Sequence, residues 1–169
     1  MADHVAVSHD VSKLLDRIKD IRIAMMTTIE NGNELHSRPM YTNTPDADGT
    51  LWFFTEQDSS KVAQVQQDRH INLGYSKPDD NLYVAITGTA QVVTDRAKIK
   101  ELWSEGLRAW FPQGSDDPNI ALLKVTITKG EFWDTPNATL LRAYAYVKAV
   151  ITGERDQPGP DRQSVVIPK

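Results

Sequence analysis

The fold is indicated most clearly by the stretch Ile21-Arg22-Ile23-Ala24-Met25-Met26-Thr27-Thr28-Ile29-Glu30-Asn31-Gly32-Asn33. Its first part is rich in apolar and β-branched side chains, which favour a strand. Its last four residues are a strong turn signal, because Asn and Gly tolerate the positive φ angles of tight hairpins. Residues 34–42 then alternate well enough to form the return strand. The stretch therefore predicts a β-hairpin.

Working outward from this hairpin, the pattern predicts about six strands and a few helices. Further strands are expected at residues 50–55, 70–76, 82–93 and 122–132, and helices at residues 8–20, 95–103 and 139–152, with a short helix that Asp58, Ser59 or Ser60 caps. Gly88 marks a bulge or a close approach inside one strand. Strands do not alternate regularly with helices, which argues against a doubly wound fold. We expect a mainly β protein, a closed antiparallel barrel with helices packed outside.

Composition excludes several classes of function. The 169 residues include no cysteine, which excludes disulfides, thiolate nucleophiles and Cys-ligated metals. The net charge of −4 disfavours a general nucleic-acid binder, because phosphate neutralisation needs a basic surface. No apolar run is long enough to cross a membrane, and the N-terminus shows no signal-peptide pattern, so a cytoplasmic location is expected. The histidines are too scattered to predict a metal site; they are His4, His9, His36 and His70.

The common catalytic motifs are also missing, so no catalytic residue is predicted. The length suits a single domain. We expect an N-terminal arm over residues 1–7, one domain over residues 8–153 and a C-terminal tail over residues 154–169. Pro158, Gly159 and Pro160 disfavour regular structure in that tail.

The segment Phe54-Thr55-Glu56-Gln57-Asp58-Ser59-Ser60-Lys61 is a candidate anion site. A predicted strand ends there and a serine-rich turn opens a helix, whose free N–H groups and dipole favour an anion. Lys61 lies in the first helical turn, where a cation is unfavourable for the helix itself. The alternative is an ordinary capped helix with a solvated lysine.

Arg38 is a second candidate for the same anion, because its guanidinium fork suits phosphate oxygens. Pro39 follows it and marks a strand edge or bulge, since proline cannot donate to the ladder. The alternative is a surface arginine in a cross-strand ion pair.

Trp110-Phe111-Pro112 lies in an irregular stretch over residues 108–119, where large apolar side chains need a surface to cover. That surface is a flat ring ligand, a partner subunit, or the protein's own barrel mouth. Core positions are expected instead for the other tryptophans, which are Trp52, Trp103 and Trp133.

Short segments in order along the chain are similar to those of one known family. They are Arg22-Ile23-Ala24-Met25-Met26-Thr27-Thr28, His36-Ser37-Arg38-Pro39-Met40, Gly49-Thr50-Leu51-Trp52-Phe53-Phe54-Thr55, Ser60-Lys61-Val62, Asn72-Leu73-Gly74-Tyr75, Val84-Ala85-Ile86-Thr87-Gly88-Thr89-Ala90, Leu102-Trp103, Ala109-Trp110-Phe111-Pro112-Gln113-Gly114, Asp117-Pro118 and Glu131-Phe132-Trp133-Asp134. Over residues 8–152 the chain resembles the general stress protein 26 group of the pyridoxamine 5'-phosphate oxidase-like, FMN-binding split-barrel superfamily.

The resemblance implies a six-stranded antiparallel Greek-key split β-barrel with flanking helices. It implies a homodimer that binds FMN at the subunit interface. The net charge and the short apolar runs lead us to expect no nucleic-acid or membrane partner. The residues that match the superfamily's cofactor site are Arg38, Ser60 and Lys61 for the phosphate, Pro39 and Met40 along the isoalloxazine edge, and Phe54 and Thr55 at a strand end. Trp110 is added by inference from its position, as a cover for the partner's flavin.

One departure from the superfamily concerns the chain end. Pyridoxamine phosphate oxidases proper have an arginine-rich C-terminal stretch, whereas this chain ends Ser164-Val165-Val166-Ile167-Pro168-Lys169. We therefore expect an FMN-binding flavoprotein with a flavin-dependent redox or flavin-binding role in stress. The alternatives are a pyridoxamine 5'-phosphate oxidase-like oxidoreductase, a deazaflavin-binding reductase and a cofactor-free interaction barrel.

Overall fold

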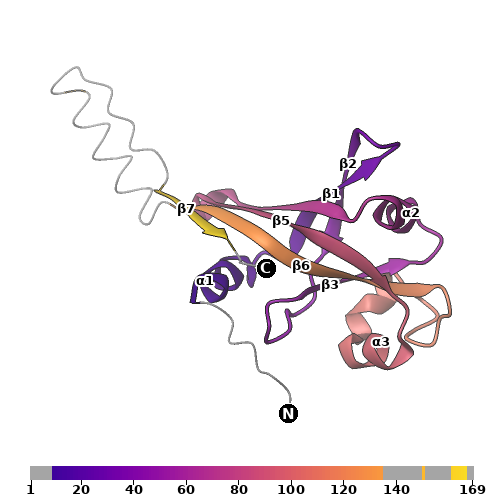
Figure 1. The fold of residues 1–169 in the computed structure, drawn as a ribbon. Helices are drawn as coiled ribbons and strands as arrows, with labels where there is room; N and C mark the ends of the chain where they lie inside the picture. The colour runs from indigo at the N-terminus through magenta and orange to yellow at the C-terminus, as the bar shows by residue number, and fades with distance from the viewer. Residues whose placement is uncertain (1–8, 135–149, 151–160, 167–169) are drawn as a thin grey trace, which may run out of the picture.

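The computed structural model describes residues 9–134, 150 and 161–166, which form one seven-stranded sheet with three α-helices and two 3-10 helices (Figure 1). In chain order the elements are α1 (His9–Ile18), β1 (Ile23–Glu30), β2 (Glu34–Tyr41), β3 (Leu51–Glu56), α2 (Ser60–Gln67), β4 (His70–Lys77), η1 (Pro78–Asp80), β5 (Leu82–Val93), α3 (Arg96–Leu102), η2 (Glu105–Ala109), β6 (Ile120–Asp134) and β7 (Asp161–Val166). The mainly β class is confirmed. The six predicted strands are present as β1 to β6, and β7 is a seventh strand that the sequence did not predict.

All strand pairs are antiparallel, and the order across the sheet is β2-β1-β4-β5-β6-β3, with β7 beside the second half of β6. β2 and β3 end the path and no ladder joins them, so the expectation of a closed barrel is wrong and the barrel is split. Pro39 suits the β2 edge, because proline has no N–H to donate to a further strand.

Two local features of the strands follow the sequence closely. The β1–β2 hairpin turns through Asn31 (φ 50°) and Gly32 (φ 85°), the left-handed conformations that this pair favours. The register between β5 and β6 shifts at Gly88, where an added Cβ would lie 2.4 Å from the carbonyl oxygen of Thr126. The predicted hairpin and the predicted close approach at Gly88 are both confirmed.

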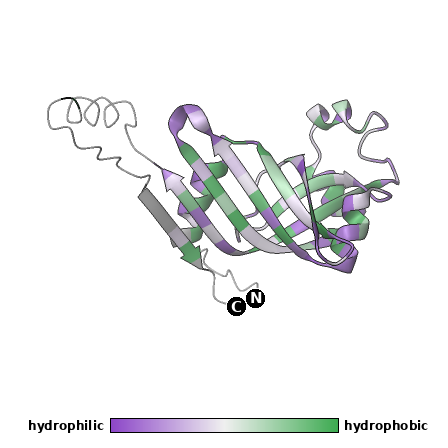
Figure 2. Ribbon diagram, turned by 90° about the horizontal axis from the view of Figure 1, so that it is seen from above, coloured by the Kyte–Doolittle hydropathy of each residue, from purple (hydrophilic) through white to green (hydrophobic). Residues whose placement is uncertain are grey.

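The core has two parts, one on each face of β3. Leu51 and Phe53 point into the main core, which the curved sheet encloses and α1 closes with Leu14. Trp52 and Phe54 point the other way, into a second apolar cluster with α3 and η2. Figure 2 shows the alternation of hydrophobic and hydrophilic residues along the strands that makes this arrangement possible. Because β3 is buried on both faces, its position at the edge of the sheet is fixed from two sides.

The C-terminal part corrects one expectation. Residues 161–166, expected from the sequence to belong to a tail without regular structure, form β7, which pairs with β6 from Lys129 to Asp134 and buries Val165. The predicted helix over residues 139–152 lies, except for Val150, outside the described residues. Over the described part of the chain, no helix is both long enough and apolar enough to cross a membrane.

Candidate functional site

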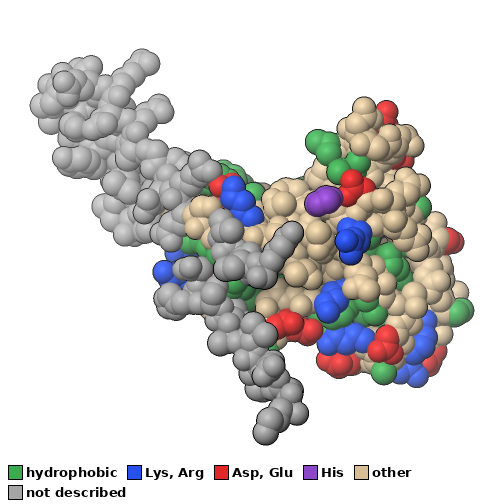
Figure 3. Space-filling model, viewed as in Figure 1, with side chains coloured by type: hydrophobic (Ala, Val, Ile, Leu, Met, Phe, Trp, Pro, Cys, Tyr) green, Lys and Arg blue, Asp and Glu red, His purple; other side chains and the backbone are tan. Residues whose placement is uncertain are grey.

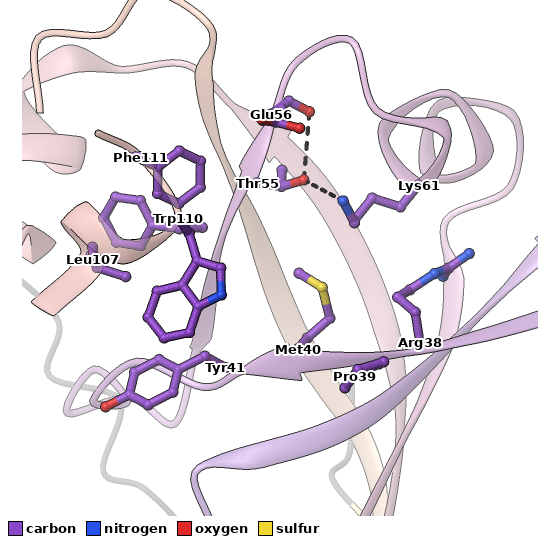
Figure 4. Close-up of a pocket in the computed structure, with 11 residues that line it drawn as sticks. Arg38, Pro39, Met40, Tyr41, Thr55, Glu56, Lys61, Leu107, Trp110 and Phe111 are labelled. Atoms are coloured by element: carbon purple, nitrogen blue, oxygen red, sulfur yellow. Dashed lines mark hydrogen bonds between the residues drawn. The ribbon is translucent and has the colours of Figure 1, made fainter. Parts of the chain in front are cut away.

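A cavity of about 350 Å³ opens between β2 and β3, the two unpaired edges of the split barrel. Four consecutive residues of β2, three of β3, one of η2 and two of the loop after η2 line it, together with one lysine from α2. The lining residues are Arg38, Pro39, Met40, Tyr41, Phe54, Thr55, Glu56, Lys61, Leu107, Trp110 and Phe111 (Figure 4). In the space-filling view, basic side chains lie beside hydrophobic ones over the region between β2 and β3 (Figure 3).

Arg38 stands at the basic end of the cavity. Its Nη1 donates to Thr28 Oγ1 (2.6 Å) and its Nη2 donates to Gln64 Oε1 (2.7 Å). Burial lowers the pKa of Arg38, and the carboxylate of Glu30 opposes this shift. The alternative of a surface arginine in a cross-strand ion pair is not what the structure shows, because both bonded partners are neutral side chains.

Lys61 extends from the first turn of α2 toward the same end of the cavity. Its Nζ donates to Thr55 Oγ1 (3.1 Å), as Figure 4 shows. Burial lowers the pKa of Lys61, the positive charge of Arg38 lowers it further, and Glu56 opposes both. Lys61 is therefore not the fully solvated lysine of the alternative. Two partly desolvated cations that repel each other favour an anion between them.

The start of α2 differs from an ordinary capped helix. Ser59 occupies the N-cap position but its side chain accepts no bond from a helix amide. Its hydroxyl donates instead to the carbonyl oxygen of Glu56 (2.7 Å) and contacts Thr55 Oγ1 (3.1 Å). Ser60, which the resemblance assigned to the phosphate, has an exposed side chain and does not line the cavity.

The opposite end of the cavity is aromatic. Trp110 is 60% exposed and stacks on Tyr41, with ring centroids 6.2 Å apart and an interplanar angle of 29°. Phe111 is buried against Phe54 and Trp103 in the second cluster. In Figure 4 Trp110 and Tyr41 lie on the side of the cavity away from Lys61 and Arg38. Trp110 therefore lies at the mouth of the cavity with most of its surface exposed.

The fold thus brings together seven of the eight cofactor residues predicted from the sequence; Ser60 is the exception. Sequence reasoning missed Tyr41, Glu56 and Leu107 among the lining residues, and it missed the two side chains that hold Arg38 from behind, Thr28 and Gln64. One signal was available for Gln64, since a polar residue stands on the buried side of α2 between Val62 and Val65.

The described histidines do not form a metal site. His36 Nδ1 lies 3.4 Å from Gln64 Nε2 and 3.4 Å from Glu30 Oε2, while His70 Nδ1 contacts Asp68 Oδ1 at 2.7 Å. Within residues 9–134, 150 and 161–166, no group of three or more metal-ligating side chains comes together.

Comparison with known proteins agrees with this fold. The family model for pyridoxamine 5'-phosphate oxidase-like proteins matches residues 9–157, so the chain belongs to that family. A solved structure assigned as general stress protein 26 from Jannaschia sp. CCS1 is 29% identical, covers 94% of this chain and 99% of its own, and has a TM-score of 0.72.

Two further relatives are informative. The general stress FMN/FAD binding protein from Xanthomonas citri is 30% identical over 75% of this chain and 89% of its own, with a TM-score of 0.64. Protein bli-3 of Neurospora crassa is 24% identical over 160 residues, which are 89% of this chain and 77% of that protein.

Proposed function

We propose that this protein is an FMN-binding flavoprotein of the general stress type. The observation that carries the proposal is one cavity with two partly buried cations, Arg38 and Lys61, at one end and the exposed Trp110–Tyr41 stack at the other. A cavity that is basic at one end and aromatic at the other suits a ligand with an anionic phosphate and a flat aromatic ring. One basic pair matches the single phosphate of FMN. The name of the Xanthomonas citri relative, FMN/FAD binding, supports a flavin as the ligand class.

In this proposal, different residues bind the phosphate and line the wall of the cavity. Arg38 and Lys61 hold the phosphate, and the first amides of α2, which Ser59 does not cap, add donors at the positive end of a helix dipole. Pro39, Met40, Phe54 and Thr55 supply the wall between the two ends. The flavin would supply the redox chemistry, while the chain supplies binding, orientation and electrostatics.

We also propose that the protein is a homodimer with the cavity at the interface. On β1, Ile23 and Met25 are 48% and 46% exposed and alternate with buried Ala24 and Met26, so an apolar face looks outward. Tyr41 lies opposite Ile23 in the ladder and is also a wall of the cavity. An apolar face of this kind marks an interaction site. A second copy covering it would therefore border the cavity.

An absorption spectrum of freshly purified protein, followed by titration with FMN and riboflavin, tests the function. We expect a flavin spectrum or micromolar or tighter FMN binding, with a clear preference over riboflavin. Equal affinity for the two would refute the phosphate site. Light scattering at micromolar concentration should give twice the mass of one chain, and a monomer that binds FMN tightly would refute the shared site.

A further inference from the structure

Arg38 is held in a closed triangle of hydrogen bonds. Its Nη1 donates to Thr28 Oγ1 at 2.6 Å and its Nη2 to Gln64 Oε1 at 2.7 Å. Thr28 Oγ1 in turn donates to Gln64 Oε1 at 2.6 Å. A flexible arginine side chain is thereby fixed at both terminal nitrogens, by one residue from β1 and one from α2. Two of its five N–H donors are used, which leaves three for a ligand.

The two anchors are more deeply buried than the arginine that they hold. Thr28 is fully buried and Gln64 is 4% exposed. A buried hydroxyl and a buried amide are costly unless their hydrogen bonds are made, and the bonds from Arg38 help to satisfy both. On its other side Gln64 Nε2 faces His36 Nδ1 at 3.4 Å, which orients the amide with its oxygen toward Arg38.

The anchors are also uncharged, so they hold the Arg38 guanidinium without neutralising its charge. A carboxylate in the place of Gln64 would hold the guanidinium equally well but would neutralise it. The carboxylate that does act on Arg38, Glu30, does so through space, and its Oε2 lies 3.4 Å from His36 Nδ1. Across the described residues, Arg38 makes no ion pair with a carboxylate within 4 Å. No directly bonded carboxylate neutralises Arg38, so its charge is available to the cavity together with that of Lys61.

We propose that Gln64 and Thr28 are positioning residues that hold Arg38 as an uncompensated cation, and that this neutral anchor sets the preference of the site for a phosphorylated flavin over riboflavin. The inference rests on the proposed FMN function. It adds that the preference depends on two residues that do not line the cavity and act through Arg38 alone.

The test measures FMN and riboflavin affinities by fluorescence titration, and apoprotein melting temperatures, for a set of variants. Gln64→Leu removes the acceptor, and Gln64→Glu keeps an acceptor but adds a charge. Thr28→Val keeps the β-branched shape of the strand residue, and Gln66→Glu is the matched control, because Gln66 is exposed on the same helix. Each Gln64 variant is also made in an Arg38→Ala background.

We expect Gln64→Leu and Gln64→Glu to weaken FMN binding by about tenfold or more and riboflavin binding by less than about twofold. Thr28→Val should act in the same direction, and Gln66→Glu should change neither affinity. In the Arg38→Ala background Gln64→Leu should cause no further loss, because its effect passes through the arginine. A general loss of structure would weaken riboflavin binding as well as FMN binding, so a nearly unchanged riboflavin affinity separates the positioning role from a structural one.

Failure of this inference is distinguishable from failure of the proposed function. If the wild-type protein binds FMN and riboflavin equally, the phosphate site itself is refuted. If the wild type discriminates but Gln64→Leu and Gln64→Glu discriminate equally well, only the positioning role is refuted. A loss in Gln64→Leu that persists unchanged in the Arg38→Ala background refutes it too. Should Gln64→Leu not fold, Gln64→Glu and Thr28→Val decide.

Discussion

Replacing Lys61 by alanine gives a direct test of the basic end of the cavity. The Lys61 ammonium has three donors, of which one is bonded to Thr55 Oγ1 at 3.1 Å, so two remain for a ligand phosphate. A hydrogen bond to a charged group contributes about 1.5–3 kcal/mol. Lys61→Ala should therefore weaken FMN binding by about tenfold to a hundredfold, and riboflavin binding hardly at all.

The apoprotein should respond differently to the same substitution. Lys61→Ala removes one hydrogen bond from a charged donor to a neutral acceptor, which is worth about 1.5–3 kcal/mol. It also removes a partly desolvated cation that Arg38 repels, as the lowered pKa of Lys61 shows. The two effects oppose each other. We expect the melting temperature without ligand to change by less than about 4 °C, since 1 kcal/mol corresponds to about 2–4 °C in a domain near this size.

Isothermal titration calorimetry with FMN and with riboflavin, plus thermal unfolding of the apoprotein, measures all three quantities on one variant. Lys13→Ala is the matched control, because Lys13 is exposed on α1 and lines neither end of the cavity. Two results would refute the reasoning: equal weakening of FMN and riboflavin, or a large loss of apoprotein stability with FMN affinity intact. The second result would make Lys61 a structural residue of the α2 turn.

Three further expectations concern pH, the aromatic end and the barrel. Burial and the positive charge of Arg38 lower the pKa of Lys61. The Lys61 contribution to FMN affinity should therefore be complete below that pKa and should be lost as pH rises through it, at a pH below the usual lysine range. FMN titrations across pH should show no such loss in Lys61→Ala. Trp110→Ala should weaken FMN and riboflavin by similar factors of about two- to tenfold, from lost stacking. Because Trp110 is 60% exposed, its removal should cost the fold less than about 1 kcal/mol in chemical unfolding. Gly88→Ala should destabilise the protein by about 1–3 kcal/mol, because its Cβ would lie 2.4 Å from the Thr126 carbonyl oxygen; an unchanged melting temperature would contradict this.

Much of this structure could be predicted because its signals are local. The Asn31–Gly32 turn fixes the hairpin, and the alternation of exposed and buried residues on β1 fixes which face is core. The strand β7 was missed because its partner lies far away in sequence. Residues 161–166 begin with polar side chains directly after Pro160. Their sequence does not indicate that β6 extends far enough to pair with them.

The residues of the candidate site could likewise be predicted where their signal is local, and could not where it depends on packing. Arg38 and Lys61 could be predicted as a pair because each stands beside a local break, a proline in a strand and a serine turn before a helix. Gln64 gives only a weak signal, as a polar residue among apolar ones on α2. Its contact with Arg38 could not be predicted, because the two are 26 residues apart and only the packing of α2 against β1 joins them. Ser60 was assigned to the phosphate by the resemblance, yet its side chain points to solvent.

The cavity and the exposed apolar face share one structural origin, the unpaired edge at β2. An edge strand presents unpaired backbone groups, and natural proteins cover or interrupt such edges. Here Pro39 interrupts the edge, while Tyr41 belongs both to the cavity wall and to the apolar face of β1 and β2. In the proposed homodimer a second copy covering that face would border the ligand, so a ligand bound there would stabilise the dimer by mass action and dimerisation would strengthen ligand binding in return. In the proposed function, ligand binding and dimerisation are coupled through Tyr41 and its stacking partner Trp110, at the aromatic end of the cavity.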